Sequence, residues 1–181
     1  MEDKGIQISF DLGQVTNDIL AKCNLISIAI RDEALSDIKA NVQEPDNPET
    51  RSIICRAITE GFGKVKAACA RWLKTGRTTD TNALERLAYE ETDPETKKTV
   101  TKYETVKLVL DIPNFNTAVT DHLKSSIHKY VVDWTMSRFL QDQVADKAKE
   151  YKELADGEDY PSIVHDLNMR ETYNLRTPHW I

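Results

Sequence analysis

The chain has 181 residues, of which 40% are hydrophobic and 30% are charged, and its net charge at pH 7 is −6. This length and composition predict one domain over residues 1–181 with a buried core, and they exclude a disordered chain as the starting interpretation. The acidic balance argues against an obligate nucleic-acid-binding protein, although the acids concentrate in residues 1–50, which hold ten acids and four bases.

The first predicted element is a strand over residues 6–12. Apolar and polar residues alternate there, which is the period of a strand with one buried face, and the apolar ones are Ile6, Ile8, Phe10 and Leu12. From Val15 onward apolar residues recur every three or four positions, which predicts an amphipathic helix that ends near Val42.

A second helix is predicted from Asn47, a good N-cap, to about Lys74. Pro48 suits the first helical position, and Gly76 suits a carboxyl-terminal stop. The strand and the two helices make a unit over residues 1–76.

The second helix is predicted to have one apolar and one cationic face. Residues 51–77 hold seven bases and one acid, Glu60. At 100° per residue, five of the bases fall opposite the apolar stripe and form a candidate interaction face: Arg56, Lys64, Arg71, Lys74 and Arg77. Three interpretations stay open: a solvated helix face, a dock for an acidic partner such as residues 1–50 of a neighbouring copy, and contact with DNA phosphates.

Residues 77–112 are predicted to form a hairpin arm. Runs near 83–90 and 98–112 flank an acidic turn that contains Pro94, which favours an antiparallel pair. The second run alternates most clearly at its end, and there it resembles the first strand. Each run ends in Asp and an apolar residue, and Gly or Pro and then a helical period follow. We therefore expect the strands near 6–12 and 98–112 to be partners in one small sheet.

Residues 113–171 are predicted to be a helical unit. A long helix with Tyr130 and Trp134 on its apolar stripe continues, with a bend, to Ala155 and stops at Gly157, and a short helix follows from Pro161. The fold class is thus α+β, predominantly α-helical, with long amphipathic helices and a small antiparallel sheet.

The irregular tail, residues 172–181, has no secondary-structure period. Its last two residues, Trp180 and Ile181, are too apolar to remain in water. They are the candidate docking tail, which folds back on its own domain or inserts into a neighbour.

No pattern in the sequence indicates a catalytic, metal or cofactor site. His122 and His128 are six positions apart and fall on different faces of their helix, and Asp121 and Asp133 are out of phase. The three cysteines lie within helical patterns and are expected to be small buried thiols: Cys23, Cys55 and Cys69. We expect no enzyme and no bound cofactor.

The chain shares its layout with one group of proteins. The shared features are the strand at 7–10 before a helix, Arg71-Trp72 ending the second helix, the strand at 103–110 before the Asn114-Phe115-Asn116 turn, the Tyr130–Trp134 helix, the segment Ala148–Tyr151, and Arg176-Thr177-Pro178 in the tail. This layout resembles the small virion proteins of tailed phages and prophages that act as connector or completion proteins at the head–tail junction.

The resemblance covers most of the chain and implies a non-enzymatic, ring-forming homo-oligomer. Its other partners would be virion proteins, and it would be assembled in the host cytoplasm into the virion. Such proteins often end in a basic tail, whereas this chain ends in His179-Trp180-Ile181, so a DNA contact by the tail is not favoured.

Two other functions remain open. One is a nucleic-acid-associated regulatory protein that uses the basic helix at 51–77, and the other is an enzyme with a dispersed active site. The amino-terminal residues contain no apolar stretch of the signal-peptide kind, and no apolar run approaches the roughly 18–20 residues that span a bilayer. We therefore expect no secretion signal, no transmembrane segment and no membrane partner.

Overall fold

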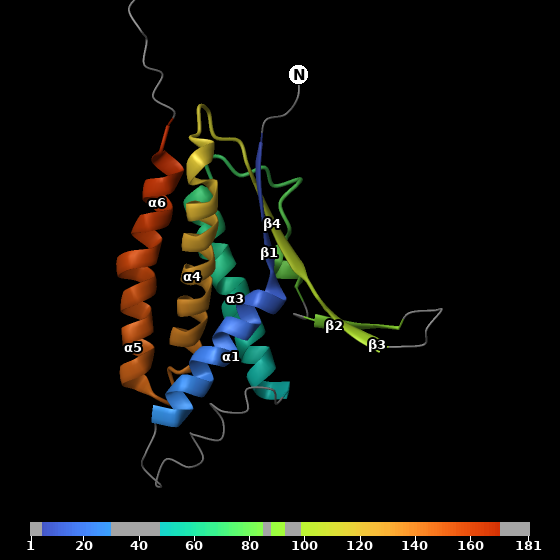
Figure 1. Ribbon diagram of the computed structural model, residues 1–181, viewed down its shortest axis with the longest axis vertical. Helices are drawn as coiled ribbons and strands as arrows, with labels where there is room; N and C mark the ends of the chain where they lie inside the picture. Colours follow the sequence, from blue (N-terminus) through green and yellow to red (C-terminus); the bar gives the residue numbers. More distant parts are fainter. Residues whose placement is uncertain (1–4, 30–47, 85–87, 93–98, 171–181) are drawn as a thin grey trace, which may run out of the picture.

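The structure, a computed structural model, describes residues 5–29, 48–84, 88–92 and 99–170, with the backbone alone for 48–50, 83, 88–92 and 99–101. The predicted fold class is confirmed: helices dominate, and strands pair antiparallel beside them (Figure 1). The elements in chain order are β1 (Ile6–Asp11), α1 (Leu12–Ala29), α3 (Pro48–Cys69), β2 (Ala88–Thr92), β3 (Thr99–Tyr103), β4 (Thr105–Leu110), α4 (Thr120–Phe139), α5 (Ala145–Leu154) and α6 (Tyr160–Asn168).

The strands β1 and β4 pair antiparallel, as the sequence predicted, with Ile6 opposite Leu110 and Asp11 opposite Thr105. Ile8 and Phe10 are buried, while Gln7 and Asp11 are exposed, so the alternation in the sequence does mark one core-facing side. The two segments Asp11-Leu12-Gly13 and Asp111-Ile112-Pro113 stand where β1 and β4 end, and each leads toward a helix, α1 or α4.

The run predicted as one strand over 98–112 changes its partner at Glu104. Before that residue β3 pairs with β2, and after it β4 pairs with β1. The predicted partner near 83–90 begins later, at Ala88, because a short 3₁₀ turn capped by the Asp80 side chain occupies Thr81–Ala83. The predicted hairpin therefore exists, but it consists of β2 and β3 alone, because β4 pairs with β1 instead.

The helix α3 ends at Cys69, not near Lys74 as predicted. The chain leaves the helix there because the next residues pair with β4. Lys74 N–H donates to Val109 O (2.9 Å), and Asp111 N–H donates to Trp72 O (2.8 Å). Residues 72–79 thereby cover the edge of β4 that β1 leaves open.

The long helix predicted after Pro113 is two helices that pack against each other. The helix α4 ends at Phe139, and after Leu140–Val144 the chain returns along α4 as α5 and α6 (Figure 1). The predicted bend is therefore a full reversal, which lets the apolar sides of both segments bury each other. The predicted stop at Gly157 is wrong, because this residue lies inside a π-helical turn, Ala155–Asp159, that joins α5 to α6.

One hydrophobic cluster extends from β1 to α6 through α1, α3 and α4. Tyr130 and Trp134, predicted as core residues, are buried and stacked at 6.3 Å between ring centroids. Trp72 is only half-buried. The predicted end of the first helix near Val42 and the predicted cap at Asn47 lie outside the described residues.

Candidate interaction surfaces

The five bases of the predicted interaction face do not form one helical stripe. Arg56 and Lys64 lie on α3, whereas the other three follow the end of the helix: Arg71, Lys74 and Arg77. The projection at 100° per residue does not apply beyond Cys69. The described structure thus separates the predicted face into two helical positions and a segment bonded to β4.

Two of these bases contact tryptophan rings. Lys64 Nζ lies 4.0 Å from the centre of the buried Trp134 ring, which Arg138 also contacts at 4.7 Å. Arg138 pairs in turn with Glu60 on α3 (3.3 Å). Because these cations cover an aromatic ring at the α3–α4 contact, Lys64 contributes to packing as well as to surface charge.

The bases beyond α3 also have neighbours within the chain. Arg71 and Arg170 both lie near the ring of Trp72, at 5.8 and 5.5 Å from its centre. Lys74 Nζ lies 3.4 Å from Asp111 Oδ2, and Arg77 is exposed but has an interaction of its own. Of the five predicted residues, Arg56 is the one that fits the predicted solvent-exposed helical position.

The hairpin of β2 and β3 extends away from the helices (Figure 1). Its base is fixed to the start of α1: Leu12 N–H donates to Glu104 O (3.0 Å), and the Tyr103 ring lies so close to Gly13 that a Cβ there would be 2.8 Å from it. Among the described residues, neither β2 nor β3 has a second strand partner. A two-stranded sheet of this kind is marginally stable in water by itself.

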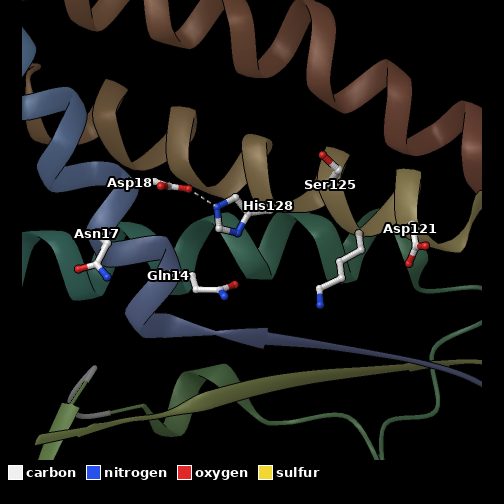
Figure 2. A pocket seen from close by; sticks show the side chains of 7 residues that line it. Gln14, Asn17, Asp18, Asp121, Ser125 and His128 are labelled. Atoms are coloured by element: carbon white, nitrogen blue, oxygen red, sulfur yellow. Dashed lines mark hydrogen bonds and ion pairs between the residues drawn. The ribbon is translucent and has the colours of Figure 1, made fainter.

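A polar groove of about 590 Å³ opens between α1 and α4. Seven residues line it: Gln14, Asn17, Asp18, Asp121, Lys124, Ser125 and His128. Figure 2 shows His128 bonded to Asp18 across the groove, at 2.7 Å between Nε2 and Oδ2. His122, on the other side of α4, bonds instead to the buried Asp166 (2.6 Å), so the two histidines do face different neighbours as predicted.

Sequence reasoning missed a pair of acids, the buried Asp133 and the half-buried Asp159. Asp133 on α4 forms an ion pair with Lys22 of α1, and Asp159 lies at the end of the π-helical turn. Burial, followed by repulsion from Asp133, raises the pKa of Asp159 to about 6. Asp159 Oδ2 is buried without a hydrogen-bond partner among the described residues. The available sequence signal was an acid inside the apolar run Tyr130–Trp134.

The cysteines match their prediction in large part. Cys23 and Cys69 are buried, burial raises the pKa of each thiol to about 12, and Cys55 is half-buried. Within the described ranges, no His, Cys, Asp and Glu side chains cluster in a way that would hold a metal ion. Nor does any helix in that part of the chain have the length and apolar character to cross a membrane.

The candidate docking tail, Trp180 and Ile181, lies outside the described residues. Comparison of the chain with protein-family models, with curated proteins and with solved structures finds no match.

Proposed function

We propose that the protein is a non-enzymatic assembly component that associates with copies of itself, as a connector or completion protein of a tailed-phage or prophage particle does. The observation that carries this proposal is the β2–β3 hairpin on the helical body. Both outer edges of the hairpin lack a strand partner among the described residues, and unpaired edges are templates for pairing with another chain.

The virion assignment rests on the layout that the sequence shares with connector proteins. In that assignment the protein forms a ring, contacts other virion proteins, and is assembled in the host cytoplasm. The nucleic-acid-associated alternative has less support, because Lys64, Arg71 and Lys74 each already lie against a group of the same chain.

A mass measurement tests the proposal. Native mass spectrometry and sedimentation velocity of the purified protein, over a roughly hundredfold range of protein concentration, should give one defined oligomer. A protein that stays monomeric over this range and changes its sedimentation when duplex DNA is added would favour the regulatory alternative and contradict the assembly proposal.

A further inference from the structure

Among the described residues the outer edge of β1 has no strand partner, and the register of this strand is known. Leu12 N–H donates to Glu104 O just beyond the β1–β4 ladder. In an antiparallel ladder the N–H and C=O groups of successive residues point to alternate sides of the strand. The N–H and C=O groups of Ile8 and Phe10 therefore point at β4. The backbone groups of Gln7, Ser9 and Asp11 therefore point the other way.

The far side of β4 supports this register independently. On β4, Lys107 lies opposite Ser9 and Val109 lies opposite Gln7. The outward carbonyl of Lys107 accepts from Thr79 N–H, and that of Val109 accepts from Lys74 N–H, at 2.9 Å each. The equivalent groups of β1 have no backbone partner among the described residues. The order is thus residues 72–79, then β4, then β1, with β1 as the open end.

The polar groove lies near this edge, although its lining residues come from α1 and α4 and not from β1. In Figure 2, β4 lies on one side of β1 and the groove lies on the other, and α4 contacts β1. The groove starts at Gln14, on the first turn of α1 directly after the strand. A strand added to β1 would therefore find room for its side chains against α4.

We infer that the outer edge of β1 and the adjoining groove bind the β2–β3 hairpin of a second copy, an inference that rests on the proposed function. The lengths match, since β2 has five residues and β1 has six. A chain cannot satisfy its own β1 edge in this way, because its hairpin continues directly into β4, which already occupies the opposite edge of β1.

Such a contact joins two different surfaces, the hairpin of one copy and the β1 edge of the next, so it is heterologous unless two copies exchange hairpins about a two-fold axis. A heterologous contact closes into a ring, or continues as a filament when the rotation does not close. Main-chain hydrogen bonds provide most of the binding, as in other cases of strand addition.

Proline on β1 tests the inference with little harm to the fold. Ser9→Pro removes an N–H that points outward, a position where an edge strand tolerates proline, and it leaves the bonds to β4 in place. Ser9→Ala is the matched control. A second variant, Glu90→Pro with Glu91→Pro, places a proline toward each edge of β2 and removes the hairpin as a partner.

Sedimentation velocity should find the wild type and Ser9→Ala assembled, and Ser9→Pro and the hairpin variant monomeric. An equimolar mixture of the two monomeric variants should form a 1:1 heterodimer and nothing larger, because one hairpin meets one edge. If Ser9→Pro assembles like the wild type, the inference is wrong while the proposed function stands. A monomeric wild type contradicts both.

Hydrogen exchange provides a test that does not depend on how the proline variants fold. In the assembled wild type the amides of Gln7, Ser9 and Asp11 should exchange on the order of tenfold or more slowly than in the monomeric hairpin variant. The amides of Ile8 and Phe10 should be protected in both. Rapid exchange of the three outward amides in the assembly would overturn the inference.

Discussion

At the residue scale, the raised pKa of Asp159 makes the free energy of unfolding depend on pH. Its folded pKa of about 6 lies above the ordinary value of 3.8, so the folded state holds this proton more tightly than the unfolded state. The stability that the proton contributes is present below about pH 4 and is lost as the pH rises through 6. At neutral pH the ionised Asp159 destabilises the fold, because it faces Asp133 in a partly buried position.

We therefore predict that Asp159→Asn stabilises the protein at pH 7.5 by about 1–2 kcal/mol. The gain should shrink toward zero at pH 4, where the wild-type carboxyl is already protonated. Urea unfolding between pH 4 and pH 8 measures both values. The control is Asp156→Asn, an exposed acid in the same π-helical turn, which should change stability by less than about 0.5 kcal/mol at either pH. A gain that is equal at pH 4 and pH 7.5 would contradict the raised pKa of Asp159.

The contact of Tyr103 with Gly13 sets the sign of a second prediction. Alanine usually stabilises a helix relative to glycine, by about 0.5–1 kcal/mol. At Gly13 the added Cβ would lie 2.8 Å from the body of the Tyr103 ring, so the ring must move. We expect Gly13→Ala to destabilise the wild type and to loosen the base of the hairpin.

In a Tyr103→Ala background the clash with the ring is gone, and the one other close atom, Asp11 Oδ1 at 3.0 Å, belongs to a short exposed side chain that can shift. The same Gly13→Ala change should then stabilise the protein. Thermal unfolding of the four proteins in this double-mutant cycle measures the reversal of sign. If Gly13→Ala has the same sign in both backgrounds, the tyrosine ring is not what requires glycine at this position.

At the element scale, periodicity in the sequence predicted the strand at 6–12, its pairing with the run that ends near 112, and the three main helical regions. It did not predict where β3 ends and β4 begins, because no glycine or proline marks the change of partner at Tyr103, Glu104 and Thr105. The change of partner depends on where α1 starts, which is a tertiary contact. The same limit explains the end of α3, since pairing of Leu73 with Leu110 competes with helix continuation.

The candidate site was less predictable than the fold. A helical projection found the bases of α3 but not their neighbours, because Lys64 contacts a tryptophan on a different helix. The pairing of Asp133 with Asp159 depends on the reversal between α4 and α5, which no glycine or proline marks in residues 140–144. The open edge of β1 follows from the register of β4, and only the structure provides that register.

The two bases on α3 should respond differently to neutralisation. Arg56→Gln removes an exposed charge and should change the free energy of unfolding by less than about 0.5 kcal/mol. Lys64→Gln also removes a cation from the face of Trp134, and should cost about 0.5–1 kcal/mol. Chemical denaturation measures both, and Lys64→Met, which keeps the aliphatic contact, separates the charge from the packing. Equal effects of Arg56→Gln and Lys64→Gln would mean that Lys64 is only a surface charge.

At the scale of the whole molecule, the described chain consists of a body with one continuous core and an arm, the β2–β3 hairpin, that has few contacts with the body. The body protects residues 72–79, because they bond to β4 beside the core. The interactions described for the arm are its two-stranded ladder, the Leu12–Glu104 hydrogen bond at its base and the contact of Tyr103 with Gly13. Local opening should therefore occur far more readily in the arm than in the body.

Limited trypsin digestion tests this difference between the arm and the body. In the monomeric Ser9→Pro variant, trypsin should cut after Lys102 in β3 sooner than after Arg77, because Arg77 lies in a turn whose two ends bond to β4, whereas the hairpin opens more readily. In the assembled wild type the cut after Lys102 should slow by on the order of tenfold or more, since the hairpin is then held in a neighbouring sheet. Mass spectrometry of the fragments identifies both sites. Early cleavage after Arg77, or an equal rate after Lys102 in monomer and assembly, would show that the arm is not the segment that association protects.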